Sequence, residues 1–171
     1  MQHTEYYAQF FTATILEWKH LLKPDKYKEV ITGSLKYLAK KNRVKIFAFV
    51  IMSNHIHLMW QVQAGNNLPD VQRDFLKFTA QQIKSDLSIH HPLVLEKFTV
   101  NAKDRMHQFW ERNPLNIDLY TSDVFLQKLE YIHWNPVKAG LCSFPEEYQY
   151  SSAGFYHTGI DNFGFLTHLN G

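Results

Sequence analysis

The stretch VKIFAFVIMSNHIHLMWQV, residues 44–62, contains two apolar runs separated by a short polar break. The first run, residues 44–52, is almost continuously apolar and rich in β-branched and aromatic residues, which is typical of a buried strand. Ser53 and Asn54 form the break, and residues 55–62 have the length of a second strand. The stretch therefore predicts a hairpin that contributes a central strand to a sheet.

The second run places two titratable rings within this predicted hairpin. Side chains alternate between the two faces of a strand, so the more apolar set is expected to face the core: Ile56, Leu58, Trp60 and Val62. His55 and His57 then lie side by side on the other face, about 7 Å apart by strand geometry, close enough to bind one metal ion. Considered without other motifs, the pair is better explained as two hydrogen-bonded or solvated histidines, because the chain contains 10 histidines in all.

The flanking sequence predicts the remaining elements. Aromatic and β-branched residues predict a strand over residues 5–16, and apolar residues at helical spacing predict helices over 26–42 and 68–87. A further strand is expected at 107–113. A third helix is expected at 122–134, with Ser122 as its N-cap and Pro136 ending it.

This order of elements predicts the fold class. Strand, helix, strand, strand, helix, strand, helix is the pattern of an α+β ferredoxin-like sandwich, in which an antiparallel sheet packs against helices. The chain of 171 residues is predicted to form a single domain over residues 1–171, because we find no repeat or linker that would divide it. No role is predicted for the tail, residues 158–171.

Composition narrows the functional classes. The chain carries 18 Lys and Arg against 16 Asp and Glu, a net charge of +2 that permits nucleic-acid binding without requiring it. A single cysteine, Cys142, excludes an intramolecular disulfide framework and a cysteine-rich zinc site. The N-terminal residues do not resemble a signal peptide, and no apolar run is long enough to span a membrane. We therefore expect a soluble cytoplasmic protein without a membrane partner.

A second candidate cluster lies in YIHWNP, residues 131–136. Tyr131 and Asn135 are one helical turn apart and share a face. Tyr131 points away from the main apolar stripe of the predicted helix, although Val124 and Trp134 lie on its side and leave a packing role open. His133 lies on a different face of the predicted helix from Tyr131, which favours packing or a hydrogen bond over metal ligation.

Taken together, these motifs resemble a known family. MSNHIHLMW at 52–60 is followed by HQFWERN at 107–113, LEYIHWNPVKAGL at 129–141 and EEYQYSSAGFY at 146–156. In this order, over about residues 5–157, the chain resembles the REP-associated tyrosine transposases and their insertion-sequence relatives, the single-tyrosine HUH transposases. The resemblance implies metal-dependent cleavage and rejoining of single-stranded DNA.

The resemblance also implies roles for particular residues. His55, His57 and Asn135 would bind a divalent metal, Mg²⁺ or Mn²⁺, and Tyr131 would be the nucleophile that becomes joined to the 5′ end of the DNA. Three neutral ligands leave the charge of the ion free to act on a phosphate, whereas histidines by themselves favour Zn²⁺ or a later transition metal. The identity of the ion stays open at this point.

The partner implied by the resemblance is DNA, single-stranded or folded as an imperfect hairpin. Arg73, Lys77 and Lys84 form a stripe on the second long helix that can follow phosphates or simply be a solvated face, and Arg112 and Lys128 are further candidates for DNA contacts. The sequence is compatible with a monomer and with a homodimer. The alternative functions are a domesticated, catalytically silent module that binds hairpin or repeat DNA, and a metallohydrolase that uses water as its nucleophile.

Overall fold

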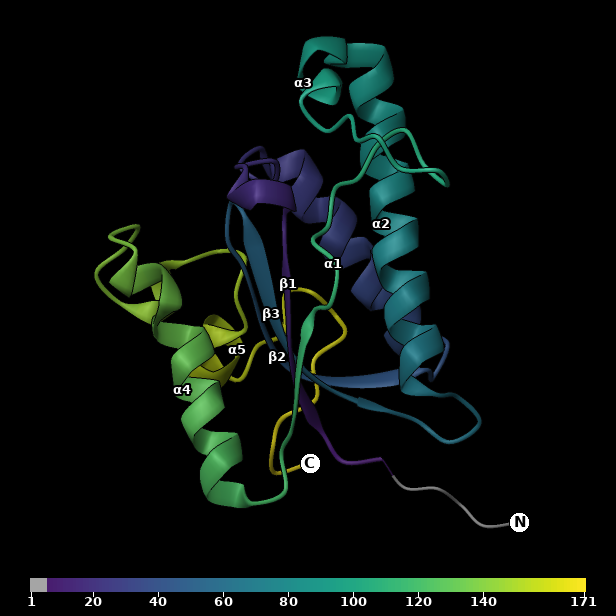
Figure 1. Ribbon diagram of the computed structural model, residues 1–171. Coiled ribbons are helices and arrows are strands. Elements are labelled where there is room, and N and C mark those ends of the chain that lie inside the picture. Colours follow the sequence, from purple (N-terminus) through teal and green to yellow (C-terminus); the bar gives the residue numbers. More distant parts are fainter. Residues whose placement is uncertain (1–5) are drawn as a thin grey trace.

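A computed structural model describes residues 6–171 of the chain, so residue 5, where the first strand was expected to begin, lies outside the described residues. The strands are β1 (Gln9–Thr14), β2 (Val44–Ile51), β3 (His55–Val62) and β4 (Leu115–Asp118). The helices are α1 (Asp25–Lys40), α2 (Leu68–His90), α3 (Pro92–Glu96), α4 (Ser122–Lys138) and α5 (Ala153–Thr158), with short 3₁₀ turns η1 (Leu16–Trp18) and η2 (Pro145–Glu147) (Figure 1).

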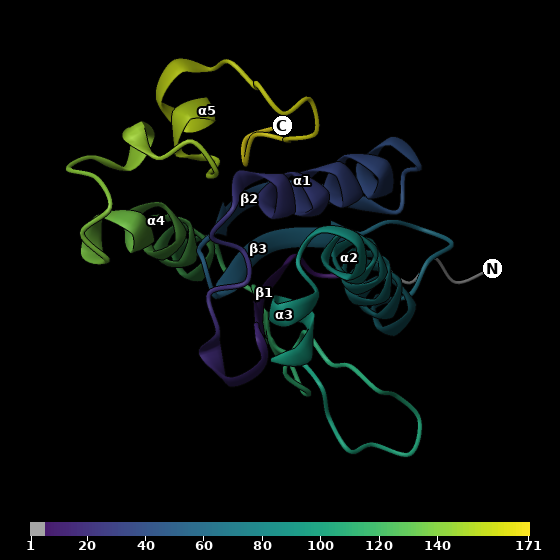
Figure 2. The same cartoon turned by 90° about the horizontal axis from the view of Figure 1, so that it is seen from above.

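The four strands form one antiparallel sheet in the order β2-β3-β1-β4. The two crossover helices α1 and α2 lie on one face of this sheet, and α4 lies on the other (Figure 2). The predicted α+β ferredoxin-like sandwich is therefore confirmed, and the predicted hairpin is the β2–β3 pair. The apolar run at 44–52, expected to be a central strand, is instead the edge strand β2; it is apolar because it is buried on both faces.

Two hydrophobic clusters of unequal size fill the two layers. The larger lies between the sheet and helices α1 and α2, and it includes the predicted core set of β3, Ile56, Leu58, Trp60 and Val62. The smaller lies between the sheet and α4 and includes Phe10, Met59, Leu129 and Ile132. The face of β3 that carries the histidines is thus covered in part by α4.

Helix α4 begins and ends differently from the sequence prediction. Its N-cap is Thr121 rather than Ser122, because the Thr121 side chain accepts a hydrogen bond from the backbone N–H of Val124 at 3.2 Å. Pro136 lies inside the helix and does not end it. The φ that the proline ring imposes is compatible with a helix, and α4 continues to Lys138 although Pro136 has no N–H to donate to the preceding turn.

The actual end of α4 is a Schellman motif at Gly140. This glycine has φ 76°, and the N–H of Leu141 donates to the carbonyl of Pro136 at 3.0 Å. Asn135 is consequently held within the helix, where its carbonyl accepts from the N–H of Ala139 at 3.1 Å. The helical spacing between Tyr131 and Asn135 is preserved as a result.

The strand predicted over residues 107–113 was wrong. His107 and Trp110 form only isolated bridges, to Thr99 and Ile15, and the fourth strand of the sheet is β4. Trp110 is buried, and its indole N–H donates to the hydroxyl of Thr79 on α2. The aromatic residues of 107–113 are present because this segment packs against α2, and they do not indicate a strand. The short edge strand β4, LNID, has too little apolar pattern to be recognised from sequence.

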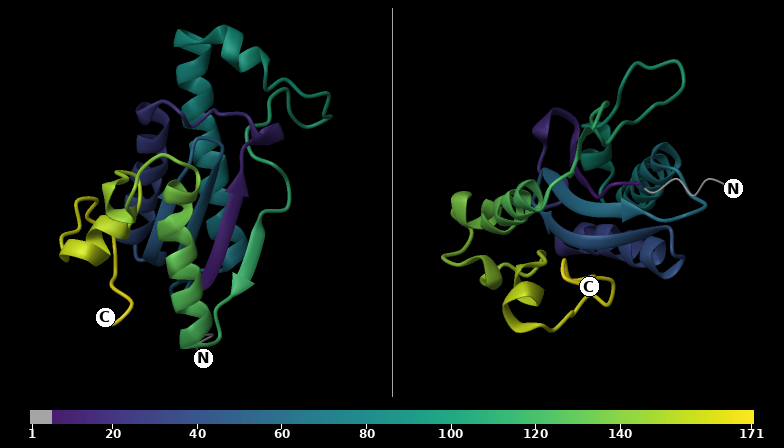
Figure 3. Two further views of the ribbon diagram at one scale, coloured as in Figure 1. Left: turned by 90° about the vertical axis from the view of Figure 1, so that its left-hand side faces the viewer. Right: turned by 90° about the horizontal axis from the view of Figure 1, so that it is seen from below.

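The tail that had no predicted role runs along the open edge of β2 (Figure 3). The N–H of Thr167 donates to the carbonyl of Ile46 at 2.8 Å, and the rings of Phe163 and Phe165 lie 4.9 and 5.4 Å from that of Phe49. Covering an edge strand removes unpaired backbone groups that would otherwise pair with other chains. The tail therefore covers the edge of β2 at Ile46.

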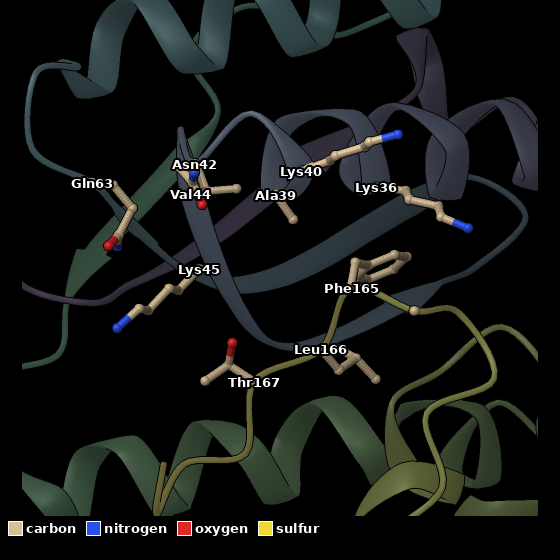
Figure 4. A pocket seen from close by; sticks show the side chains of 11 residues that line it. Lys36, Ala39, Lys40, Asn42, Val44, Lys45, Gln63, Phe165, Leu166 and Thr167 are labelled. Carbon is tan, nitrogen blue, oxygen red and sulfur yellow. The ribbon is translucent and has the colours of Figure 1, made fainter.

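A pocket of about 440 Å³ lies where this tail meets α1 and the start of β2 (Figure 4). Lys36, Lys40 and Lys45 border it, but Lys45 points away from the side on which the other two lysines project. These charges do not converge on one point. Gln63, which follows β3, also lines the pocket, so the pocket lies at the end of the strand opposite to His55.

None of the helices described between residues 6 and 171 is long and apolar enough to cross a membrane.

Replacing Phe165 by Ala tests whether the tail contributes to the fold. Phe165 is 7% exposed and belongs to the larger core, so its removal should lower the free energy of unfolding by about 3 kcal/mol. Ile160, which is 63% exposed in the same tail, provides the control, and Ile160→Ala should change stability by less than about 0.5 kcal/mol. Urea denaturation measures both, and equal effects would contradict the assignment.

Candidate functional site

The two histidines of β3 lie next to each other beneath α4. Their rings are edge to face with centroids 4.8 Å apart, and the β1–β3 register aligns His57 with Thr12 and His55 with Thr14. His57 is 5% exposed and His55 is half-buried. The alternation predicted from the sequence is therefore present, but the face is more enclosed than a solvated strand face.

The imidazole of His57 has one nitrogen with a partner and one without. Its Nδ1 lies 2.7 Å from the hydroxyl of Thr12. Its Nε2 is buried and has no hydrogen-bond partner among the described residues. Buried polar atoms in proteins usually have a partner, so this ring nitrogen remains available to bond a ligand or an ion.

The protonation of both rings suits coordination. The pKa of His57 is lowered to about 3, chiefly by burial and to a smaller extent by the nearby charges of His55 and Lys128. Burial also lowers the pKa of His55, an effect partly offset by a hydrogen bond with the side chain of Asn135. Both imidazoles are therefore neutral at pH 7, which is the form that donates a lone pair to a metal.

Tyr131 faces the histidine pair from α4. Its ring lies 5.3 Å from that of His57 and 5.9 Å from that of Phe10, and the side chain is 43% exposed. The ammonium groups of Lys128 and Lys138 each lie 5.7 Å from the centre of the ring. The tyrosine is thus both next to the histidines and open to an incoming ligand.

His133 takes the packing role that helix geometry predicted. Its Nε2 lies 2.8 Å from the hydroxyl of Ser152, and its ring contacts that of Tyr156. Burial lowers the pKa of His133 to about 4. It belongs to the contact between α4 and the C-terminal segment, and it does not join the histidine pair.

The other predicted DNA contacts are distributed over the molecule. Arg73, Lys77 and Lys84 lie exposed on α2, in the layer across the sheet from α4. Arg73 is paired there with Asp70 and Asp74. Arg112 is exposed in the segment before β4, so among these candidates only Lys128 borders the histidine–tyrosine cluster.

Sequence reasoning missed two neighbours of the histidines. Thr12 contacts His57, and the ring of Trp18 lies edge to face with that of His55 at 5.9 Å. Both follow from the pairing of β1 with β3, and no sequence signal gives that register. No group of three or more His, Cys, Asp or Glu side chains that could hold a metal exists in residues 6–171, and the side chain of Asn135 forms a hydrogen bond with His55.

Comparison with known proteins decides the family. The model of the family described as IS200-like transposases matches residues 5–111, more than half of the chain. The chain belongs to the IS200-like transposase family. Its coarse functional class is accordingly DNA transposition. The matched segment of this transposase contains the histidine pair and ends before α4, so the position of Tyr131 rests on the geometry described above.

Two solved structures share the fold of this IS200-like transposase. A REP-associated tyrosine transposase bound to a REP hairpin is 15% identical, with a TM-score of 0.68 and alignment over 99% of this chain and 90% of that one. A proposed transposase from Deinococcus radiodurans is 14% identical, with a TM-score of 0.50 over 77% of this chain and 92% of that one. No curated protein sequence matches the chain.

Replacing Thr12 by Val tests the hydrogen bond that orients His57. The valine keeps the shape of the side chain but leaves Nδ1 of a buried imidazole without a partner, which should lower the free energy of unfolding by about 1–3 kcal/mol. Thr14→Val, on the same face of β1, should cost less than about 0.5 kcal/mol. Denaturant unfolding of the two variants provides the comparison, and equal losses would show that the hydroxyl is not needed.

Proposed function

We propose that this IS200-like transposase cuts and rejoins single-stranded DNA through a covalent 5′-phosphotyrosine at Tyr131, with a divalent metal held by His55, His57 and Asn135. The observation that carries the proposal is the unpartnered, buried Nε2 of His57 beside the exposed ring of Tyr131. The atom that we assign to metal binding and the side chain that we assign as nucleophile come from different elements and lie next to each other, which supports the proposal.

The donor set fits a divalent metal that acts on phosphate. When bound, Mg²⁺ or Mn²⁺ would neutralise and orient the charge of a phosphodiester oxygen. His57 would contribute Nε2, with its other ring nitrogen fixed by Thr12, and His55 would contribute from the adjacent position with Asn135 beside it. All three side chains are neutral, so none of them would reduce the positive charge of the metal ion that acts on the phosphate.

The covalent step uses Tyr131 as the nucleophile. Its Oη would form a bond to phosphorus while the bond from phosphorus to the 3′ oxygen breaks, leaving a 3′-hydroxyl on one fragment and the 5′ phosphate on the tyrosine. The phenolic proton passes to solvent, and the leaving 3′ oxygen takes up a proton. Attack by the 3′-hydroxyl of another strand would then restore the phosphodiester and free the tyrosine without ATP.

Two ammonium groups support an anionic substrate at this position. Lys128 and Lys138 lie on the same helix as Tyr131 and flank its ring, so a phosphodiester approaching the hydroxyl enters between cations. The solved relative is bound to a REP hairpin, which supports DNA with a hairpin next to a single strand as the substrate here. A silent DNA-binding module and a metallohydrolase remain as outcomes of the test.

The decisive experiment is a search for a covalent protein–DNA adduct. Labelled hairpin-bearing single strands are incubated with the protein and Mn²⁺, and a denaturing gel should show an adduct that Tyr131→Phe abolishes. Tyr120→Phe, at an exposed tyrosine just before α4, is the matched control and should keep the adduct. Cleavage without an adduct would favour the hydrolase, and specific binding without cleavage would favour the silent module.

Metal dependence gives an independent test. EDTA should abolish adduct formation and added Mn²⁺ should restore it. Thr12→Val should weaken Mn²⁺ binding about 10- to 100-fold in calorimetry, because it removes the group that orients His57. Thr14→Val should bind Mn²⁺ like the parent protein. Adduct formation that persists after complete chelation would contradict the metal role, and binding of Zn²⁺ alone would change the assigned ion.

A further inference from the structure

Trp18 occupies an unusual position at the edge of the histidine–tyrosine cluster. It ends the 3₁₀ turn η1, which follows β1 and lies beside the start of β3 (Figure 1). Its side chain is 59% exposed, and its ring lies edge to face with that of His55. A large apolar ring is therefore presented to solvent next to a proposed metal ligand.

Packing does not account for this exposure. Trp60 and Trp110 are buried in the larger core, at 0% and 7% exposure, as expected for the side chain that buries the most apolar area. Trp18 contributes little to that core. A single exposed indole is unremarkable elsewhere on a surface, but this one lies in contact with the proposed site.

The backbone that presents Trp18 is strained. Glu17 and Trp18 have φ 55° and 57°, in the left-handed region that bulky residues seldom adopt and that costs about 1–2 kcal/mol per residue. The turn is held by hydrogen bonds from the N–H of Glu17 to a carboxylate oxygen of Glu111 at 2.6 Å and from the N–H of Trp18 to the carbonyl of Ile15 at 2.9 Å. The surrounding structure thus fixes this conformation, as it does at many functional sites.

Four rings form a row across this end of the sheet. Trp18 lies 5.9 Å from His55, His55 lies 4.8 Å from His57, and His57 lies 5.3 Å from Tyr131. A phosphodiester placed between the histidines and the tyrosine would lie near the middle of the row. A strand bound there has bases on both sides of this phosphate, and Trp18 is the exposed aromatic surface next to His55.

We infer that Trp18 is a stacking site for an unpaired nucleobase next to the scissile phosphate, an inference that rests on the proposed function. Indole stacks on any base, so such a contact holds the strand without reading its sequence. The acidic groups around it are partnered: the carboxylate of Glu17 pairs with Lys19 at 3.4 Å, and that of Glu111 accepts from the turn itself. Trp18 would position the strand, and it takes no part in bond making.

The test measures binding without cleavage. Tyr131→Phe protein without metal is titrated into fluorescein-labelled oligothymidylate and into an abasic strand of equal length, which has the same phosphates but no bases. Adding Trp18→Leu should weaken oligothymidylate binding about 5- to 100-fold, the effect of losing one stacked base, and should change abasic-strand binding by less than about twofold. Trp18→Phe should retain most of the affinity for oligothymidylate.

Controls separate stacking from indirect effects. Tyr37 is an exposed aromatic residue on α1, across the sheet, and Tyr37→Leu should leave both affinities unchanged. Unchanged affinity in Trp18→Leu, an equal loss on the abasic strand, or the same loss in Tyr37→Leu would overturn the inference. The binding assay needs neither metal nor Tyr131, so its outcome is independent of the adduct assay. A negative result in one assay does not change the interpretation of the other.

A second measurement avoids replacing Trp18, in case its substitution disturbs the fold. In a Trp134→Phe background, Trp18 is the exposed indole, because the remaining tryptophans are buried. Oligothymidylate should quench its emission, and the abasic strand should not. Equal quenching by both strands, or by neither, would overturn the inference.

Discussion

The antiparallel pairing of β1 with β3 aligns Thr12 with His57 and Thr14 with His55 at the centre of the sheet. This register gives His57 its hydrogen bond on Nδ1 and leaves Nε2 facing the layer beneath α4. A slip of one residue would turn both imidazoles into the larger core and bring Ile56 and Leu58 to the other face. The apolar set of β3 makes such a slip very unfavourable, so the core itself fixes where the histidines lie.

Helix α4 carries Tyr131 and Asn135, and the position of its C-terminal end determines how these two side chains are arranged. Because Pro136 is accommodated within the helix and Gly140 ends it, Tyr131 and Asn135 stay one turn apart on the face that looks toward His55 and His57. Leu129 and Ile132 hold the helix against the sheet through the smaller cluster. The tyrosine is thus positioned by apolar contacts on either side of it, while its own ring remains accessible.

The chemical character of the cluster comes from what surrounds it. Burial keeps both imidazoles neutral, and the ammonium groups of Lys128 and Lys138 lie near the ring of Tyr131. The two ammonium groups favour an anionic ligand such as a phosphate, and the neutral imidazoles have lone pairs with which they could bind a metal ion. An anionic ligand agrees with the transposase family to which the chain belongs, because the backbone of DNA is a chain of phosphates.

The sequence by itself determined the two central strands, the three long helices, the α+β class and the alternation of His55 and His57, because apolar periodicity reports directly which side of an element is buried. It failed at β4, at the cap of α4 and at Pro136, where short edge pairing and local geometry leave little pattern. Only the tertiary structure decided that Thr12 and Trp18 adjoin the histidines and that Arg73, Lys77 and Lys84 lie across the sheet. Those relations depend on strand register and on the face that each helix covers, which are set by contacts between residues far apart in the chain.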